Sequence, residues 1–147
     1  MHNLPTYRIV LAEDDEDDRF LFRQAVGQLK AEVNLRIMDN GEKLLEYLSR
    51  LEPEDLPHMI FLDLHLPKKN GIQCIRELRS NRKYNNIPII MFTTSGLPPD
   101  VEASAKLGAN MYIRKYDNFN TLVKTLNDLL TDEGYRFLLQ QRRSEEL

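Results

Sequence analysis

The chain has 147 residues, of which 41 % are hydrophobic and 29 % are charged, the balance of one ordinary globular domain. A formal net charge of −3 gives no general attraction to nucleic acid or to an anionic membrane, so neither is expected as a partner. A single cysteine, Cys74, excludes an internal disulfide and favours a reducing compartment. The sequence opens without a signal peptide, and no apolar run approaches the roughly 20 residues that span a bilayer, so a cytoplasmic location is expected.

Short apolar runs alternate with amphipathic stretches along the chain. In chain order, the pattern predicts a strand over 7–12, a helix over 21–29, a strand over 33–37, a helix over 44–51, a strand over 59–62, a helix over 72–78, a strand over 89–92, a helix over 98–105, a strand over 110–113 and a helix over 119–130. Asn40 is placed to cap the second helix, and Gly108 is placed to close the fourth.

The order of these elements predicts an α/β fold. The runs 59–62 and 89–92 are apolar throughout, as in central strands buried on both faces, whereas 33–37 alternates like a half-exposed edge strand. Five β–α units with right-handed crossovers favour a flavodoxin-like, doubly wound parallel sheet in the order 2-1-3-4-5. We expect this domain to cover residues 5–131, with a short C-terminal helical extension over 132–147.

Polar side chains follow four of the predicted strands. Glu13 and Asp14 come after the first strand, Asp63 after the third, Thr93 after the fourth and Lys115 after the fifth. Ligands of open α/β sheets bind beyond the carboxyl ends of the strands, so these side chains are expected to converge.

The residue types at this edge indicate phosphoryl chemistry. Carboxylates at close range repel one another unless a cation lies between them. Oxygen ligands suit Mg²⁺, which commonly takes one or two carboxylates together with a phosphate. A lysine and a threonine hydroxyl opposite can bind the remaining phosphoryl oxygens, which is the arrangement of a phosphoryl-transfer site.

The same residues carry a resemblance to a known family. Glu13-Asp14, the segment Asp63-Leu64-His65-Leu66-Pro67 with Gly71, Thr93 and Lys115 match the CheY-like receiver domains of two-component response regulators over residues 7–130. The acidic loop before the third strand, the Leu-Pro-Lys-Lys-Asn-Gly segment and the C-terminal tail resemble the small stand-alone response regulators associated with phytochromes. Those regulators carry no output domain.

The resemblance implies a role for each matching residue. Asp63 is the phosphoacceptor, which receives its phosphoryl group from a sensor histidine kinase, with a bacterial phytochrome as a candidate kinase. Glu13, Asp14, Asp63 and the backbone carbonyl of His65 hold Mg²⁺, for which Mn²⁺ or Ca²⁺ can substitute. Lys115 pairs first with Asp63 and then with the phosphoryl group.

The resemblance also implies a switch. Thr93 moves to bond a phosphoryl oxygen, and Tyr112 occupies the aromatic position that turns inward in response; plain core packing is the alternative for Tyr112. Tyr116 stands where receivers usually carry a proline in a cis peptide, and we expect the Lys115–Tyr116 peptide to be trans because a cis bond there costs about 3–4 kcal/mol. The acidic run from Asp15 to Asp18 is interpreted as a solvated helix start.

The C-terminal tail leaves two interpretations open. Tyr135, Leu138 and Leu139 recur at helical spacing. They either fold back onto their own domain or form a dimerisation element, because an extra apolar stripe on a small domain needs cover. A homodimer is expected on the second interpretation.

Two other functions fit the motifs less well. A phosphorylation-independent pseudo-receiver that acts as a binding module is the alternative, but none of the site residues is missing. A phosphatase with an aspartyl-phosphate intermediate commonly has a second aspartate two residues after the nucleophile, where this chain has His65. We therefore expect a signalling phosphoacceptor and not an enzyme, with phosphoryl transfer to and loss from Asp63 as its only chemistry.

Overall fold

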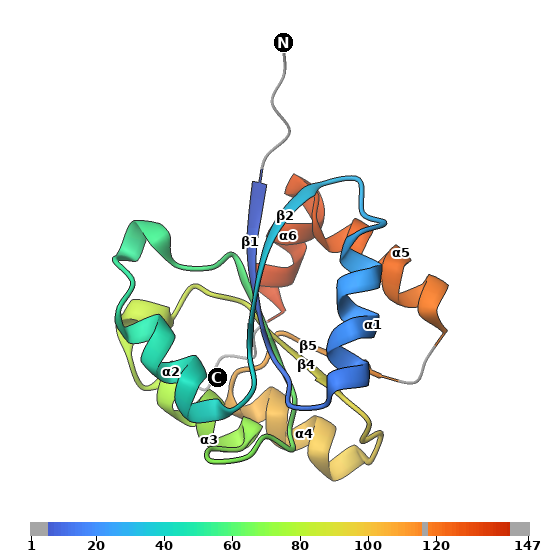
Figure 1. Ribbon diagram of the computed structural model, residues 1–147. Helices are drawn as coiled ribbons and strands as arrows, with labels where there is room; N and C mark the ends of the chain where they lie inside the picture. Colours follow the sequence, from blue (N-terminus) through green and yellow to red (C-terminus); the bar gives the residue numbers. More distant parts are fainter. Residues whose placement is uncertain (1–5, 116–117, 142–147) are drawn as a thin grey trace.

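The computed structural model describes residues 6–115 and 118–141. Its strands are β1 (Thr6–Ala12), β2 (Glu32–Met38), β3 (Met59–Leu62), β4 (Ile89–Thr93) and β5 (Met111–Arg114). Its helices are α1 (Glu16–Val26), α2 (Gly41–Ser49), α3 (Gly71–Arg79), α4 (Pro98–Leu107), α5 (Phe119–Leu129) and α6 (Asp132–Gln140), with 3-10 turns at Pro53–Asp55 and Arg82–Tyr84. The strands form one parallel sheet in the order β2-β1-β3-β4-β5, which confirms the predicted fold (Figure 1).

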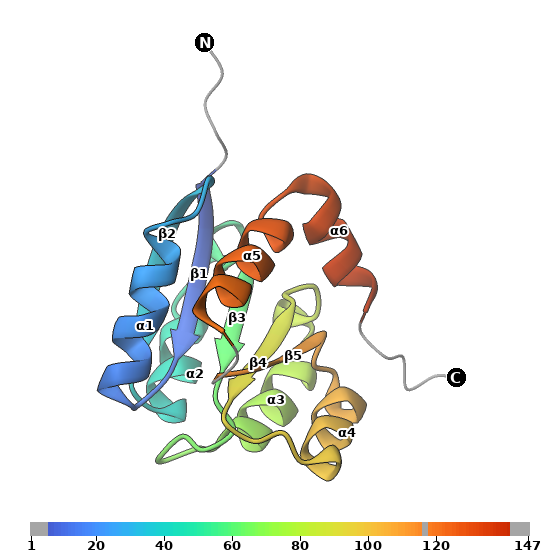
Figure 2. The ribbon, with the colours of Figure 1, turned by 90° about the vertical axis from the view of Figure 1, so that its right-hand side faces the viewer.

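Helices cover both faces of the sheet (Figures 1 and 2). Alternate residues of the central strands point to opposite faces, as Ile60 and Phe61 of β3 show. Ile60 packs with α2, α3 and part of α4, whereas Phe61 packs with α1, α5 and α6. β3 and β4 are buried throughout, which confirms their predicted central position.

The caps of two helices are those that the sequence predicts. The Asn40 side chain accepts a hydrogen bond from the backbone N–H of Lys43 at 2.8 Å and so begins α2. Gly108 ends α4 in the left-handed conformation, with φ of 110°. Asn40 therefore marks the start of α2 and Gly108 the end of α4, as the sequence predicts.

Gly71 begins α3 directly behind Asp63. A Cβ atom at this position would lie 2.5 Å from the carbonyl oxygen of Asp63, closer than a side chain tolerates. The Gly71 N–H donates to the carbonyl of Leu64 at 2.9 Å. A glycine is therefore needed where the chain after β3 turns back into a helix.

Helix α6 packs on its own domain. Leu138 is only 1 % exposed and belongs to the core on the α1–α5 face. Its carbonyl accepts a hydrogen bond from the Asn110 side chain at 3.0 Å, and the Tyr135 ring meets the His58 ring edge-on. Two of the three tail residues, Tyr135 and Leu138, thus face their own domain, as the first interpretation of the tail has it, while Leu139 is 38 % exposed.

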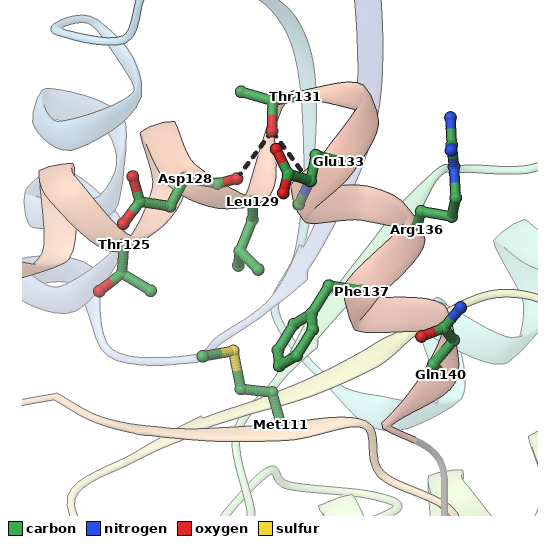
Figure 3. Close-up of a pocket in the computed structure, with 10 residues that line it drawn as sticks. Met111, Thr125, Asp128, Leu129, Thr131, Glu133, Arg136, Phe137 and Gln140 are labelled. Carbon is green, nitrogen blue, oxygen red and sulfur yellow. Dashed lines mark hydrogen bonds between the residues drawn. The ribbon is translucent and has the colours of Figure 1, made fainter.

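A groove of about 700 Å³ lies between α6, α5 and β5 (Figure 3). Phe137, which is 59 % exposed, extends from α6 toward Met111 of β5 across this groove. The helical pattern in the sequence did not single out Phe137. Whether α6 contributes to a dimer stays a prediction. The division of the chain into a domain over 5–131 and an extension over 132–147 also stays a prediction, and residues 142–147 lie outside the described part.

None of the helices within residues 6–115 and 118–141 has both the length and the hydropathy that crossing a membrane requires.

Candidate functional site

The acidic residues lie where two neighbouring strands end. Glu13 directly follows β1, and Asp63 directly follows β3. The Glu13 N–H donates to the carbonyl of Met38 at 2.9 Å, and the Asp63 N–H donates to the carbonyl of Ala12 at 3.2 Å. The sheet therefore holds the backbone of both residues in place, and both are buried.

Three carboxylates converge at this edge. One oxygen from each of Glu13, Asp14 and Asp63 lies within 4.8 Å of the others. Asp14 is exposed, so the cluster is open to solvent on one side. The backbone of these residues is tied to α1, because the Arg19 guanidinium donates to the carbonyls of Glu13 and Asp14 at 3.2 and 3.0 Å.

Lys115 is the buried cation of the site. Its N–H donates to the carbonyl of Thr93 at 2.8 Å, which extends the pairing of β4 and β5 by one residue. Its Nζ donates hydrogen bonds of 2.9 Å to Asp63 and to Asp18. A third carboxylate oxygen, Oε1 of Glu13, lies 2.5 Å from Nζ as an ion pair whose geometry is not that of a hydrogen bond.

Asp18 corrects one interpretation of the sequence. The acidic run that begins α1 is not wholly solvated, because the side chain of Asp18 is only 10 % exposed and is paired with Lys115. Asp15 caps the helix by accepting from the Asp18 N–H at 2.9 Å, while Glu16 and Asp17 are exposed as expected. The helical period carried a signal, since Asp18 lies four residues before Phe22, which is fully buried.

Burial and pairing shift two pKa values in this cluster. Burial raises the pKa of Glu13 from 4.5 to about 7, and the nearby Asp63 charge adds to this, although Lys115 opposes it. Burial alone would lower the pKa of Lys115. Its hydrogen bonds with Asp18 and Asp63 and its ion pair with Glu13 outweigh that effect, so the pKa of Lys115 is raised and the ammonium form is firmly held.

Thr93 and His65 flank Asp63 in different ways. The hydroxyl oxygen of Thr93 is fully buried and has no hydrogen-bond partner among the described residues. The backbone N–H of His65 donates to Oδ1 of Asp63 at 3.3 Å, while the His65 side chain is exposed. An unpaired buried hydroxyl is costly, so Thr93 is a group that can gain a partner when the site is loaded.

Tyr112 links β5 to the loop after β4. Its hydroxyl donates to the carbonyl of Ser95 at 2.8 Å, and its ring is half-buried against the core on the α2–α3 face. Both interpretations of Tyr112, switch and packing residue, are compatible with this position. The Lys115–Tyr116 peptide falls outside the described residues, so the expected trans bond stays a prediction.

The donor set fits a small divalent cation. The three clustered groups offer only oxygen atoms and together carry more negative charge than Lys115 neutralises. Lys115 and the unpaired Thr93 hydroxyl leave hydrogen-bonding capacity for a further anionic group. The five positions that the sequence singled out therefore meet at one edge of the sheet, and Asp18 joins them.

Comparisons with known proteins match this architecture. Residues 9–127 match the family model of the response regulator receiver domain. The response regulator Rcp1 of Synechocystis sp. is 31 % identical over 128 residues, which cover 85 % of this chain and 87 % of Rcp1.

Two solved structures share the fold closely. The Mn²⁺-bound form of Rcp1 aligns with a TM-score of 0.73 at 30 % identity, over 84 % of this chain and 91 % of the other. The phosphorylated cyanobacterial phytochrome response regulator RcpA aligns with a TM-score of 0.73 at 28 % identity, over 84 % of this chain and 90 % of the other. Together with the matched domain, these likenesses show that the chain belongs to the response regulator receiver family and is related to phytochrome response regulators.

Proposed function

We propose that this chain is a phosphoacceptor switch in which Asp63 takes a phosphoryl group from a sensor histidine kinase. The observation that carries the proposal is the buried pairing of Asp63 with Lys115, 2.9 Å apart, beside the carboxylates of Glu13 and Asp14. An acidic nucleophile, a fixed ammonium and an oxygen-only cluster are the parts that phosphoryl transfer to a carboxylate needs.

Glu13, Asp14 and Asp63 would hold Mg²⁺, with the backbone carbonyl of His65 as a further ligand. When bound, the cation supplies positive charge that offsets the phosphoryl oxygens and the crowded carboxylates. The bound Mn²⁺ named for the Rcp1 structure supports a divalent cation here.

The transfer itself is a direct displacement. A carboxylate oxygen of Asp63 forms the new P–O bond while the P–N bond of a kinase phosphohistidine breaks. The electron pair stays on the imidazole nitrogen, which then takes up a proton. Lys115 would bond the phosphoryl group through its Nζ, and Thr93 would bond a second oxygen; the Lys115–Asp63 hydrogen bond and the unpaired Thr93 hydroxyl support these roles.

The conformational response starts from Thr93. Once its hydroxyl turns toward the phosphoryl group, the loop after β4 moves with it, and that loop holds Tyr112 through the carbonyl of Ser95. The shift in population can only be as large as the difference in interaction between the two states. The phytochrome response regulator among the similar structures makes a phytochrome the first kinase to test. We also propose that the protein is cytoplasmic and acts as a homodimer.

Intact-mass measurement with a small phosphodonor tests this function. In the presence of Mg²⁺ the chain should gain one phosphoryl mass, and removing Mg²⁺ with a chelator should abolish the gain. Asp63→Asn should gain none under the same conditions. An unmodified wild-type chain, or an Asp63→Asn variant modified to the same extent, would contradict the proposal.

A further inference from the structure

We propose that Asp18 is a positioning residue that holds the Lys115 ammonium and thereby eases the entry of a divalent cation among Glu13, Asp14 and Asp63. This inference rests on the proposed metal site and deepens it. The pair joins two elements far apart in the sequence, the first turn of α1 and the residue after β5.

The Asp18 side chain is held in place from two sides. Its own backbone N–H is fixed by the Asp15 cap at 2.9 Å, and its Oδ2 lies 2.9 Å from Nζ of Lys115. The side chain of Asp18 is 10 % exposed and that of Lys115 is 3 % exposed. A charge removed from water to this degree is costly unless it is paired, so the contact is a constraint and not a loose surface bridge.

Asp18 differs from the other two partners of Lys115. Glu13 and Asp63 belong to the carboxylate cluster that fits a metal, and Asp18 does not. An ammonium and a divalent cation compete for the same carboxylate oxygens. Asp18 therefore gives Lys115 a partner that it keeps when a cation draws on the other two.

Loss of that partner has a definite direction. Without the Asp18 charge, Lys115 would depend on Glu13 and Asp63 alone. A cation that took those oxygens would leave a buried ammonium poorly compensated, which is costly. Metal binding should therefore weaken, although Asp18 is not one of the three clustered carboxylates.

Calorimetric titration of the full chain with Mg²⁺ alone tests the direction. Asp18→Asn should raise the dissociation constant about tenfold, the range seen when partners of metal ligands are removed. Asp18→Glu, which keeps the charge, should recover most of the affinity. Asp17→Asn removes an equal charge from the exposed face of the same turn, and it should change affinity less than about twofold because solvent and salt screen it.

A double-mutant cycle separates positioning from a general field effect. In a Lys115→Gln background, Asp18→Asn should cause no further loss of Mg²⁺ affinity, because the residue through which it acts is gone. An equal loss in both backgrounds would overturn the inference. So would unchanged affinity in Asp18→Asn beside a wild-type chain that binds Mg²⁺, whereas a wild-type chain that binds no Mg²⁺ would overturn the proposed metal site itself.

Should Asp18→Asn fail to fold, carbon NMR of the wild-type side-chain carboxyls decides. Addition of Mg²⁺ should shift the Cγ resonance of Asp63 and leave that of Asp18 near its metal-free position. Comparable shifts at both carbons would show that Asp18 is itself a ligand and would overturn its role as a partner for Lys115 alone.

Discussion

At the scale of residues, the ammonium of Lys115 is paired with three buried carboxylates. Lys115 lies within 2.9 Å of oxygens of Glu13, Asp18 and Asp63, so the resting site carries more negative than positive charge. Charge crowding of this kind favours protonation of the most buried acid, and Glu13 is fully buried. The protonation of Glu13 and the loading of the site by a cation are consequently linked.

That linkage sets a pH dependence. The pKa of Glu13 is raised to about 7 in the metal-free protein, so below this pH a cation must displace a proton from Glu13. We expect the affinity for Mg²⁺ to fall as pH drops from 7 toward 5.5, by up to about tenfold per pH unit. Calorimetric titrations at several pH values measure it. Glu13→Gln should bind more weakly and with little pH dependence in this window, and an equally steep dependence in that variant would assign the proton to another group.

Thr93 offers a test of the resting state. Thr93→Val replaces an unpaired buried hydroxyl by a methyl of the same shape. The free energy of unfolding of the unphosphorylated protein should therefore stay the same or rise, by up to about 1 kcal/mol. Urea unfolding measures the change, with the half-buried neighbour Thr94→Val as the comparison. A clear loss of stability in Thr93→Val alone would mean that the hydroxyl is already bonded before phosphorylation.

The sequence allowed most of these residues to be found, but not Asp18. Glu13, Asp63 and Thr93 each follow an apolar run directly, and Lys115 follows another after Arg114, so the topology alone brings them together. Asp18 lies inside an acidic run whose usual explanation is a solvated helix start. Its spacing of four residues before Phe22 is the one sequence signal that Asp18 turns inward, and the structure shows that it does.

At the scale of elements, the strands and helices followed the hydrophobic pattern closely. Strands β3 and β4 begin where predicted and differ at most by one residue at their ends. The extent of α1 was harder, because its first turn is polar and contains no apolar residue to reveal the period. The orientation of α6 depends on tertiary contacts with β5 and α5 that no local pattern shows.

Helix α6 illustrates this most clearly. Leu138 and Leu139 lie three and four residues after Tyr135, so both match the helical period. Yet Leu138 is 1 % exposed and Leu139 is 38 % exposed. The Asn110 side chain helps to fix which leucine faces inward, because its amide donates a hydrogen bond to the Leu138 carbonyl. The amide oxygen of Asn110 in turn accepts a hydrogen bond from the Ile89 N–H at 3.0 Å. The helix is therefore fastened to the start of β4.

This difference can be measured by truncating each leucine in turn. Leu138→Ala should lower the free energy of unfolding by about 3 kcal/mol, because it leaves a cavity in the core. Leu139→Ala should change it by less than about 1 kcal/mol, since a partly exposed side chain loses little burial. Urea unfolding of both variants gives the comparison. Equal losses would mean that α6 does not pack as described, and a loss that depends on protein concentration would point to a dimer interface instead.

At the scale of the whole molecule, the parallel sheet assembles the site. Neighbouring strands β1, β3, β4 and β5 end at one edge, and the residue after each strand, or its last residue in β4, carries a functional group (Figure 2). The helices on the two faces leave this edge free, as in open α/β sheets generally. The central claim that follows is that Asp63, and no other acid of the chain, carries the phosphoryl group.

Borohydride trapping after phosphorylation tests that claim most directly. The chain is treated with a small phosphodonor and Mg²⁺, and borohydride then reduces the acyl phosphate so that the modified aspartate becomes homoserine. Tryptic cleavage yields a peptide of residues 51–68, which contains both Asp55 and Asp63. We expect homoserine at position 63, with Asp55 unchanged. Homoserine at another position, or none in a chain that has gained phosphoryl mass, would contradict the assignment of Asp63 as the phosphoacceptor.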